Sequence, residues 1–275
     1  MFTTEPWKVK HRNRLHPQGG SPYLRPVLGH QLLVIADAHL GITPPAVEEG
    51  LLDFLDQAPA LGDCLLVNGD LFDFWFSYRR VIPREGFVVA AALGRLRKRM
   101  PVVITGGNHD RWGGQFWQRD LGIEFAPGAT SFLVGERLVL ATHGDGLTDQ
   151  HWSARLMHRI TDTPAVIALW RAMHPDIGFW LVDRMSRSLG NTTRDPAVLE
   201  RVAARQRDWA EARLAGDPDL GGVIMAHSHR AALVEPAPGR LYLNPGAWMD
   251  GLRYAVVTDS SARLARFGDT AAASA

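Results

Sequence analysis

The sequence predicts an α/β fold in which two sheets pack face to face and helices cover their outer faces. Its first half alternates short apolar, β-branched runs with segments of helical periodicity, a pattern typical of parallel strands joined by helices. Its second half carries short strand-like runs separated by turn residues. Polar motifs directly follow several of these runs, which places the chemistry at strand ends, where α/β folds gather their ligands.

Three strands and two helices are expected in the first half. The strands are the apolar runs 32–36, 65–68 and 102–105, each of strand length and followed by polar or glycine-rich sequence. The helices are 46–57 and 87–100, where apolar residues recur at helical spacing. This order predicts that the three strands pair in parallel.

The second half contains shorter strands and one long interruption. Between 148 and 214 the sequence has no strand pattern but several helical segments punctuated by proline and glycine, which we interpret as a helical lid over the strand ends. The expected strands are 131–134, 138–142, 222–226, 241–243, 254–258 and 263–267.

These elements divide the chain into a core and its additions. The core is expected to comprise 31–147 and 215–268, with the lid inserted at 148–214. Residues 1–30 are rich in proline and basic side chains and predict a flexible basic arm, and 269–275 predict a frayed tail.

Composition excludes several classes of protein. With 46% hydrophobic and 21% charged residues, the 275-residue chain is typical of a globular protein, and no apolar run is long enough for a membrane span. A net charge of +1 argues against bulk binding of nucleic acid. Cys64 is the only cysteine, so no internal disulfide can form; with no secretory signal at the N-terminus, a cytoplasmic location is expected.

Five short polar motifs recur in a fixed order along the chain. Each follows an apolar run, so all five are expected on one rim of the sheets. They are Asp37-Ala38-His39, Gly69-Asp70-Leu71-Phe72-Asp73, Gly107-Asn108-His109-Asp110, His143-Gly144-Asp145 and His227-Ser228-His229.

These motifs supply the carboxylates, imidazoles and single amide that a dinuclear metal centre needs. Mn²⁺, Fe²⁺ and Zn²⁺ accept carboxylate oxygen together with neutral imidazole, and the chain offers no thiolate cage. Any one motif alone has an ordinary structural interpretation, such as a core histidine or a capping aspartate. The ordered set predicts a metal-dependent enzyme.

In this order, the motifs resemble those of the calcineurin-like metallophosphoesterases, and the resemblance covers the chain from Leu32 to Phe267. It implies a four-layer αββα sandwich that holds two divalent ions, with manganese expected and iron or zinc as alternatives. It also implies the ligands: Asp37, His39 and His229 for the first ion, Asn108, His143 and His227 for the second, and Asp70 bridging both.

Within that superfamily, the run from Gly69 to Phe76 and the long helical insertion are similar to UDP-2,3-diacylglucosamine hydrolases. That resemblance implies cleavage of a pyrophosphate to give UMP and 2,3-diacylglucosamine 1-phosphate in lipid A synthesis. Better-known members have arginine where this chain has His109, which leaves a soluble nucleotide or another phosphoester as the alternative substrate.

Further roles are expected for residues beside the ligands. We expect His109 to contact the phosphoryl group or to protonate the leaving oxygen, with Asp110 orienting its ring, and Asn108 to bind substrate as well as metal. Asp73 and Asp145 are expected to orient histidines or to fix loops. A polar cluster in the lid is suited to a phosphate or a sugar: Ser186, Arg187, Asn191 and Arg194.

The lid is rich in large apolar residues, which three arrangements explain equally well: packing among its helices, a homodimer interface, or a groove for acyl chains. An acylated substrate and the basic arm together would favour peripheral contact with the inner face of the cytoplasmic membrane. A metal-free interaction module is the competing class of function, and the presence of all seven ligands argues against it.

Overall fold

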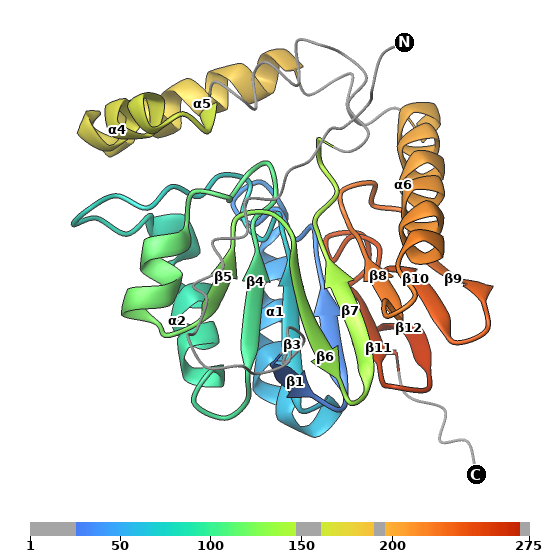
Figure 1. Cartoon of the computed structure of the whole chain (residues 1–275). Helices are drawn as coiled ribbons and strands as arrows, with labels where there is room; N and C mark the ends of the chain where they lie inside the picture. Colours follow the sequence, from blue (N-terminus) through green and yellow to red (C-terminus); the bar gives the residue numbers. More distant parts are fainter. Residues whose placement is uncertain (1–25, 147–160, 190–195, 270–275) are drawn as a thin grey trace, which may run out of the picture.

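A computed structural model of the chain describes residues 26–146, 161–189 and 196–269, with side chains at 183 and 185–189 left out. It contains two six-stranded sheets packed against each other (Figure 1). The expectation of two face-to-face sheets with helices outside is confirmed.

The first sheet has the strand order β12-β11-β2-β3-β4-β5. Its four strands β2 to β5 are parallel, as the strand and helix alternation predicts, and β11 and β12 extend it antiparallel. The strands are β2 (Leu32–Ile35), β3 (Cys64–Asn68), β4 (Val102–Thr105), β5 (Glu124–Ala126), β11 (Arg253–Val257) and β12 (Ala262–Arg266).

The second sheet has the order β1-β6-β7-β8-β10-β9. Strands β7, β8 and β10 are parallel, while β6 and β9 are antiparallel to their neighbours β7 and β10. The strands are β1 (Val27–Gly29), β6 (Thr130–Val134), β7 (Arg137–Ala141), β8 (Gly222–Ile224), β9 (Ala232–Ala237) and β10 (Arg240–Asn244).

Helices complete four layers. Helices α1 (Pro45–Leu61) and α2 (Phe87–Leu96) bury Leu51, Phe54 and Leu93 against the outer face of the first sheet. A short η1 turn (Arg84–Gly86) precedes α2, and a π-helical turn, η2 (Phe116–Asp120), precedes β5. Helix α6 (Pro196–Gly216) packs on the outer face of the second sheet.

Two observed boundaries differ from the expected ones. Strand β1 pairs with β6, so the sheet begins at Val27, inside the segment expected as an arm. Three residues are too few for a periodic signal, which is why the sequence did not reveal this strand. The second half of α6 buries Gln206, Ala210 and Leu214, so the core reaches back into the segment expected as a lid.

Helices α4 (Pro164–Ala172) and α5 (Pro175–Leu189) project beyond the strand ends, apart from both sheets (Figure 1). Aromatic contacts join them to the loop after β3: Phe74 lies 5.2 Å from Phe179 and 6.0 Å from Trp170 between ring centroids. Among the helices of the described residues, none combines the length and the apolar character that crossing a bilayer requires.

Candidate metal centre

The predicted ligands share one rim of the sandwich because each follows a strand that ends there. Parallel strands send their carboxyl ends to the same edge, and here both sheets contribute. Asp37 and His39 follow β2, Asp70 follows β3, Asn108 follows β4, His143 follows β7, and His227 and His229 follow β8.

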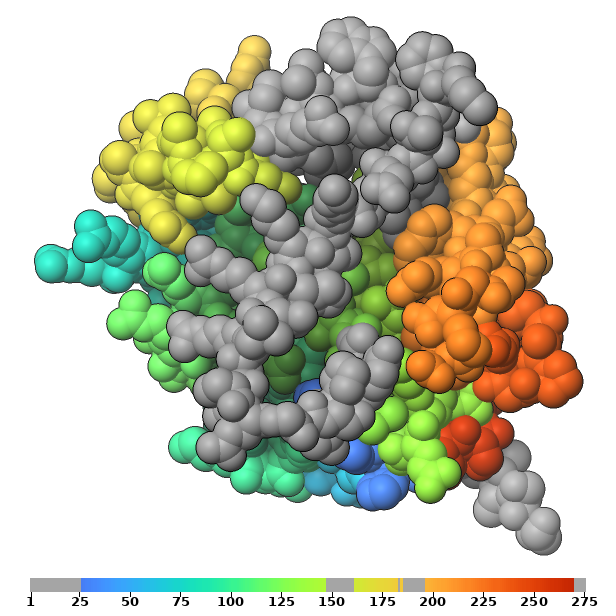
Figure 2. All heavy atoms as spheres, viewed as in Figure 1, coloured from blue at the N-terminus to red at the C-terminus, as the bar shows by residue number. Residues whose placement is uncertain are grey.

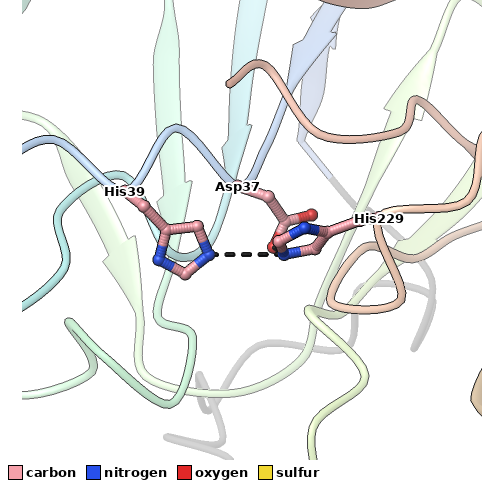
Figure 3. Close-up of side chains that lie close together, drawn as sticks. All are labelled: Asp37, His39 and His229. Carbon is pink, nitrogen blue, oxygen red and sulfur yellow. Dashed lines mark hydrogen bonds and ion pairs between the residues drawn. The ribbon is translucent and has the colours of Figure 1, made fainter. Parts of the chain in front are cut away.

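Asp37, His39 and His229 form one group at this rim. Each offers one ligand atom, and these atoms lie within 4.8 Å of one another. His229 Nε2 lies 3.3 Å from His39 Nε2 and 3.6 Å from Asp37 Oδ1. Figure 3 shows the side chains of Asp37 and His39, from the loop after β2, and of His229, from a distant part of the sequence, turned toward a common point.

Asp70, His143 and His227 form a second group of the same size. His143 Nε2 lies 3.0 Å from Asp70 Oδ2. The same carboxylate oxygen lies 3.9 Å from His39 Nε2 of the first group. Asp70 therefore stands between the two groups, as a bridging ligand must.

The backbone at these ligands is strained. Asp37, His39, Asp70, His227 and His229 have φ values between 45° and 67°. Non-glycine residues rarely adopt this left-handed region, and when they do they cluster at functional sites. In the described residues, Leu252 is the one other non-glycine residue with positive φ.

Hydrogen bonds between loops hold these conformations. His39 N donates to the Asp70 carbonyl at 3.1 Å, and His227 N donates to Asp37 Oδ2 at 3.1 Å. Gly107 packs so closely on Asp70 that a side chain there would collide with its carboxylate. The strand-end glycine thus permits the close approach that the site needs.

Burial and mutual charge shift the pKa values across the site. Burial raises the pKa of Asp37 to about 7, although His143 opposes the shift. Burial also disfavours the charged form of Asp70, but His143 and other histidines outweigh it and hold the Asp70 pKa well below its usual value. In turn, Asp70 raises the pKa of His143 well above normal despite burial, whereas burial lowers the pKa of His229 to about 3. Metal ligands must be deprotonated, so a divalent cation at this site would replace the protons that the raised pKa values of Asp37 and His143 favour.

The donor set fits a pair of divalent ions. Within the described residues, Asp37 Oδ1 and Asn108 Oδ1 are buried and make no hydrogen bond. Buried polar atoms are rarely left unpaired, so these two oxygens indicate a missing ligand. His143 Nδ1 donates to the Asn68 carbonyl at 2.8 Å, which leaves Nε2 as the coordinating nitrogen. Carboxylate, amide and imidazole together match Mn²⁺, Fe²⁺ or Zn²⁺.

His109 lies at the edge of the site, with its side chain 30% exposed. Its Nδ1 lies 2.6 Å from the Asp73 carbonyl oxygen, which serves as the acceptor for the ring. The expectation that Asp110 orients this ring is wrong. The Asp110 carboxylate is buried and accepts hydrogen bonds from the backbone N–H groups of Asp70, Leu71 and Gly107, because its side chain turns toward the loop that follows β3.

Sequence reasoning missed Arg111. Its Nε donates to the Gly107 carbonyl at 3.2 Å, and its guanidinium pairs with Asp145 and with Asp162, just before α4. Asp145 thus fixes a loop, as expected, but through an arginine. An arginine directly after a ligand motif was the available signal, and its partners are too distant in sequence to be inferred.

Four predicted substrate-binding residues cannot be placed in the site. Ser186, Arg187, Asn191 and Arg194 lie outside the residues whose side chains the structure describes.

Comparisons with known proteins show the family to which the chain is similar. A family model described as calcineurin-like phosphoesterase matches residues 30–231. A UDP-2,3-diacylglucosamine hydrolase of Serratia proteamaculans is 30% identical over 141 residues, which are 51% of this chain and 59% of that relative. The match therefore spans less than two thirds of the length of that relative. One of Pectobacterium carotovorum is 26% identical, over 86% of this chain and 98% of the relative. Among solved structures, the phosphoesterase Yfce from E. coli has a TM-score of 0.40 at 14% identity, covering 86% of this chain and 99% of that one.

Proposed function

Because this chain belongs to the calcineurin-like phosphoesterase family, we propose that it is a dinuclear hydrolase of UDP-2,3-diacylglucosamine. The reaction splits the pyrophosphate into UMP and 2,3-diacylglucosamine 1-phosphate. The chain is a metal-dependent phosphoester hydrolase by family, and relatives named for this substrate extend over most of its length. The identity of the substrate as this lipid is our proposal, and the following observations support it.

The apolar surface of α4 and α5 is the observation that carries the lipid substrate. Leu169, Ile177 and Trp180 are 55% to 63% exposed on these helices, which project beyond the strand ends (Figure 1). Large exposed apolar residues can serve as a binding surface. Acyl chains lying against them would be held close to the reacting pyrophosphate.

The ligand groups divide between two ions. In our proposal Asp37, His39 and His229 hold the first, and Asn108, His143 and His227 hold the second, with Asp70 shared between them. The group of Asp37, His39 and His229 and the group of Asp70, His143 and His227 support this division. When bound, a pair of divalent ions, manganese in our proposal, activates water for attack on phosphorus and neutralises charge on the phosphoryl oxygens. Asn108 contributes a neutral amide, so it adds no negative charge that would repel the substrate.

His109 is proposed to contact the phosphoryl group or to give a proton to the leaving oxygen. Nδ1 donates to the Asp73 carbonyl, which leaves Nε2 for the substrate, and the doubly protonated ring is the form that would give a proton from Nε2. The His109 side chain is partly exposed, so a substrate can reach it, whereas metal ligands such as Asp37 and Asp70 are buried. The polar residues Ser186, Arg187, Asn191 and Arg194 remain our proposal for binding the sugar and its phosphates.

Acyl-chain dependence tests the substrate. We expect full-length protein with Mn²⁺ to release UMP from UDP-2,3-diacylglucosamine, and shortening both chains by several carbons to lower kcat/KM by orders of magnitude. Each buried methylene contributes up to about 0.8 kcal/mol. UMP release, measured by chromatography, gives kcat/KM for both forms.

Deacylated UDP-glucosamine is the matched comparison, because it keeps the pyrophosphate and the nucleotide. Equal kcat/KM for the acylated and deacylated substrates would overturn the lipid proposal. A soluble nucleotide or another phosphoester would then be the better substrate, an alternative that His109 favours. The apolar residues of α4 and α5 would in that case be explained by helix packing or a homodimer.

A substrate of this kind also places the enzyme at the inner face of the cytoplasmic membrane in our proposal. The loop after β3 and the start of α2, residues 79–88, expose Val81, Ile82, Phe87 and Val88, and this stretch also contains three arginines. In Figure 2 the teal atoms of this loop protrude below the yellow atoms of α4 and α5. Apolar side chains beside arginines suit an anionic bilayer surface.

We expect the protein to sediment with vesicles that contain phosphatidylglycerol, and the pair R79E and R80E to weaken that binding by about tenfold or more. Each arginine near such a surface contributes about 1 kcal/mol. Leu264→Ser, which alters an exposed apolar residue on β12, is the control and should bind as wild type does. Unchanged binding of the double variant would contradict a role for this loop.

A further inference from the structure

Helix α6 places a fully buried amide against the last metal-binding loop. Gln206 has no exposed surface, and its Nε2 donates to the Ala226 carbonyl at 2.9 Å. Ala226 directly precedes His227. Along the same helix face Ala210 and Leu214 pack into an apolar cluster, where burying an amide costs free energy unless it is hydrogen-bonded.

The Ala226 carbonyl is the centre of a small hydrogen-bond network. It also accepts from Asn244 Nδ2 at 3.1 Å and from Ser228 N at 2.7 Å. The bond from Ser228 closes a three-residue turn whose central residue, His227, has a φ of 67°. Such tight turns with positive φ are strained and persist where surrounding contacts enforce them.

Gln206 also touches a second ligand loop. Gly144, next to His143, packs so closely on Gln206 that a side chain at this glycine would collide with the amide nitrogen. Ala226 N in turn donates to the His143 carbonyl at 2.9 Å. One buried side chain therefore lies between the loops that carry His143 and His227, the two histidines proposed for the second ion.

We propose that Gln206 is a positioning residue for the second metal ion, holding the peptide at Ala226 so that His227 keeps its strained conformation. This inference rests on the dinuclear centre of the proposed function and not on the lipid substrate. It also gives the inserted segment a role besides the expected one of a lid, because α6 ends that segment and contacts the metal loops.

A second contact from α6 offers a comparison. Glu200 Oε1 lies 2.9 Å from Arg230 Nε, one residue after His229. Both side chains are well exposed, and exposed ion pairs contribute little. Gln206 should therefore matter much more than Glu200, although both join the same helix to the same loop.

The test is a Mn²⁺ titration of the purified full-length protein, followed by calorimetry, with no substrate present. We expect Gln206→Met, which keeps the length but removes the amide, to weaken binding of one of the two ions by about 10- to 100-fold, the usual effect of losing a contact behind a metal ligand. Glu200→Gln should bind both ions as wild type does.

Leu214→Ala is the control for packing of α6, since it should lower the melting temperature of the metal-free protein and leave Mn²⁺ affinity unchanged. If Gln206→Met does not fold, Gln206→Glu serves in its place: it keeps the size and polarity, sets a carboxylate against the carbonyl, and should weaken the same ion. Wild-type affinity for both ions in a folded Gln206 variant would overturn the inference. If wild-type protein binds fewer than two Mn²⁺ ions, the dinuclear proposal itself fails.

Discussion

Replacing Asp70 with alanine is expected to abolish hydrolysis. Asp70 stands between the two ligand groups, 3.0 Å from His143 and 3.9 Å from His39. Without it neither ion is held where both can act on the same phosphoryl group. The measurements are kcat and the number of Mn²⁺ ions bound per chain.

Asp70→Asn removes the negative charge of this side chain but keeps its shape. The Asp70 carboxylate also accepts a hydrogen bond from His109 N at 3.0 Å, which an asparagine carbonyl oxygen can replace. We therefore expect Asp70→Asn to fold more stably than Asp70→Ala and still to lose activity. Asp70→Ala could instead retain more than about a tenth of wild-type kcat, which corresponds to an increase of less than about 1.4 kcal/mol in the activation free energy. That result would show that the two ions do not act as a pair bridged by Asp70.

His109→Ala is expected to keep both ions and to lose about 10² to 10⁴ in kcat, the usual size of an acid–base contribution. The side chain is partly exposed, and its ring hydrogen bond goes to the Asp73 carbonyl, so its removal should leave the buried ligands in place. Activity and Mn²⁺ content are measured on the same preparation.

Arg119→Ala is a suitable control for that variant, since it removes a side chain near the end of η2, away from the rim. It should match wild-type protein in both measurements. If His109→Ala loses an ion, His109 is a metal ligand. The rings of His109 and His39 are close enough for this outcome, with 4.9 Å between their centroids.

The candidate ligands could be gathered from the sequence because two simple regularities agree. Short apolar runs predict buried strands, and parallel strands bring whatever follows them to one edge. Asp37 and His227 are 190 residues apart and still meet, with the backbone N–H of His227 on the Asp37 carboxylate. A motif at a strand end thus carries positional information that the same motif elsewhere would lack.

Partners behind the ligands could not be predicted in the same way. Asp110 turns to backbone N–H groups of another loop, Arg111 pairs with Asp145 and Asp162, and Gln206 meets Ala226 from an outer helix. Each of these contacts depends on side-chain direction and on which loops are adjacent, neither of which periodicity specifies.

The fold followed the sequence where elements are uniformly apolar or long and periodic, and departed from it where they are short, partly exposed as in β9, or serve two purposes. Strands β1 and β5 have three residues each, below the length at which alternation can be recognised. Helix α6 carries apolar residues for the sheet and polar residues for the site, so composition alone assigned it to the insertion.

The five ligands with positive φ lower the stability of the fold, although the proposed reaction requires their side chains. Left-handed backbone costs about 1–2 kcal/mol for each residue with a side chain, so five such positions cost about as much as the whole net stability of a typical domain. Glycine would adopt these conformations freely, yet it offers no ligand atom. A selection for thermal stability alone would therefore favour glycine at the metal ligands and give a stable fold without activity. A selection carried out with metal present would favour the native histidines and aspartates.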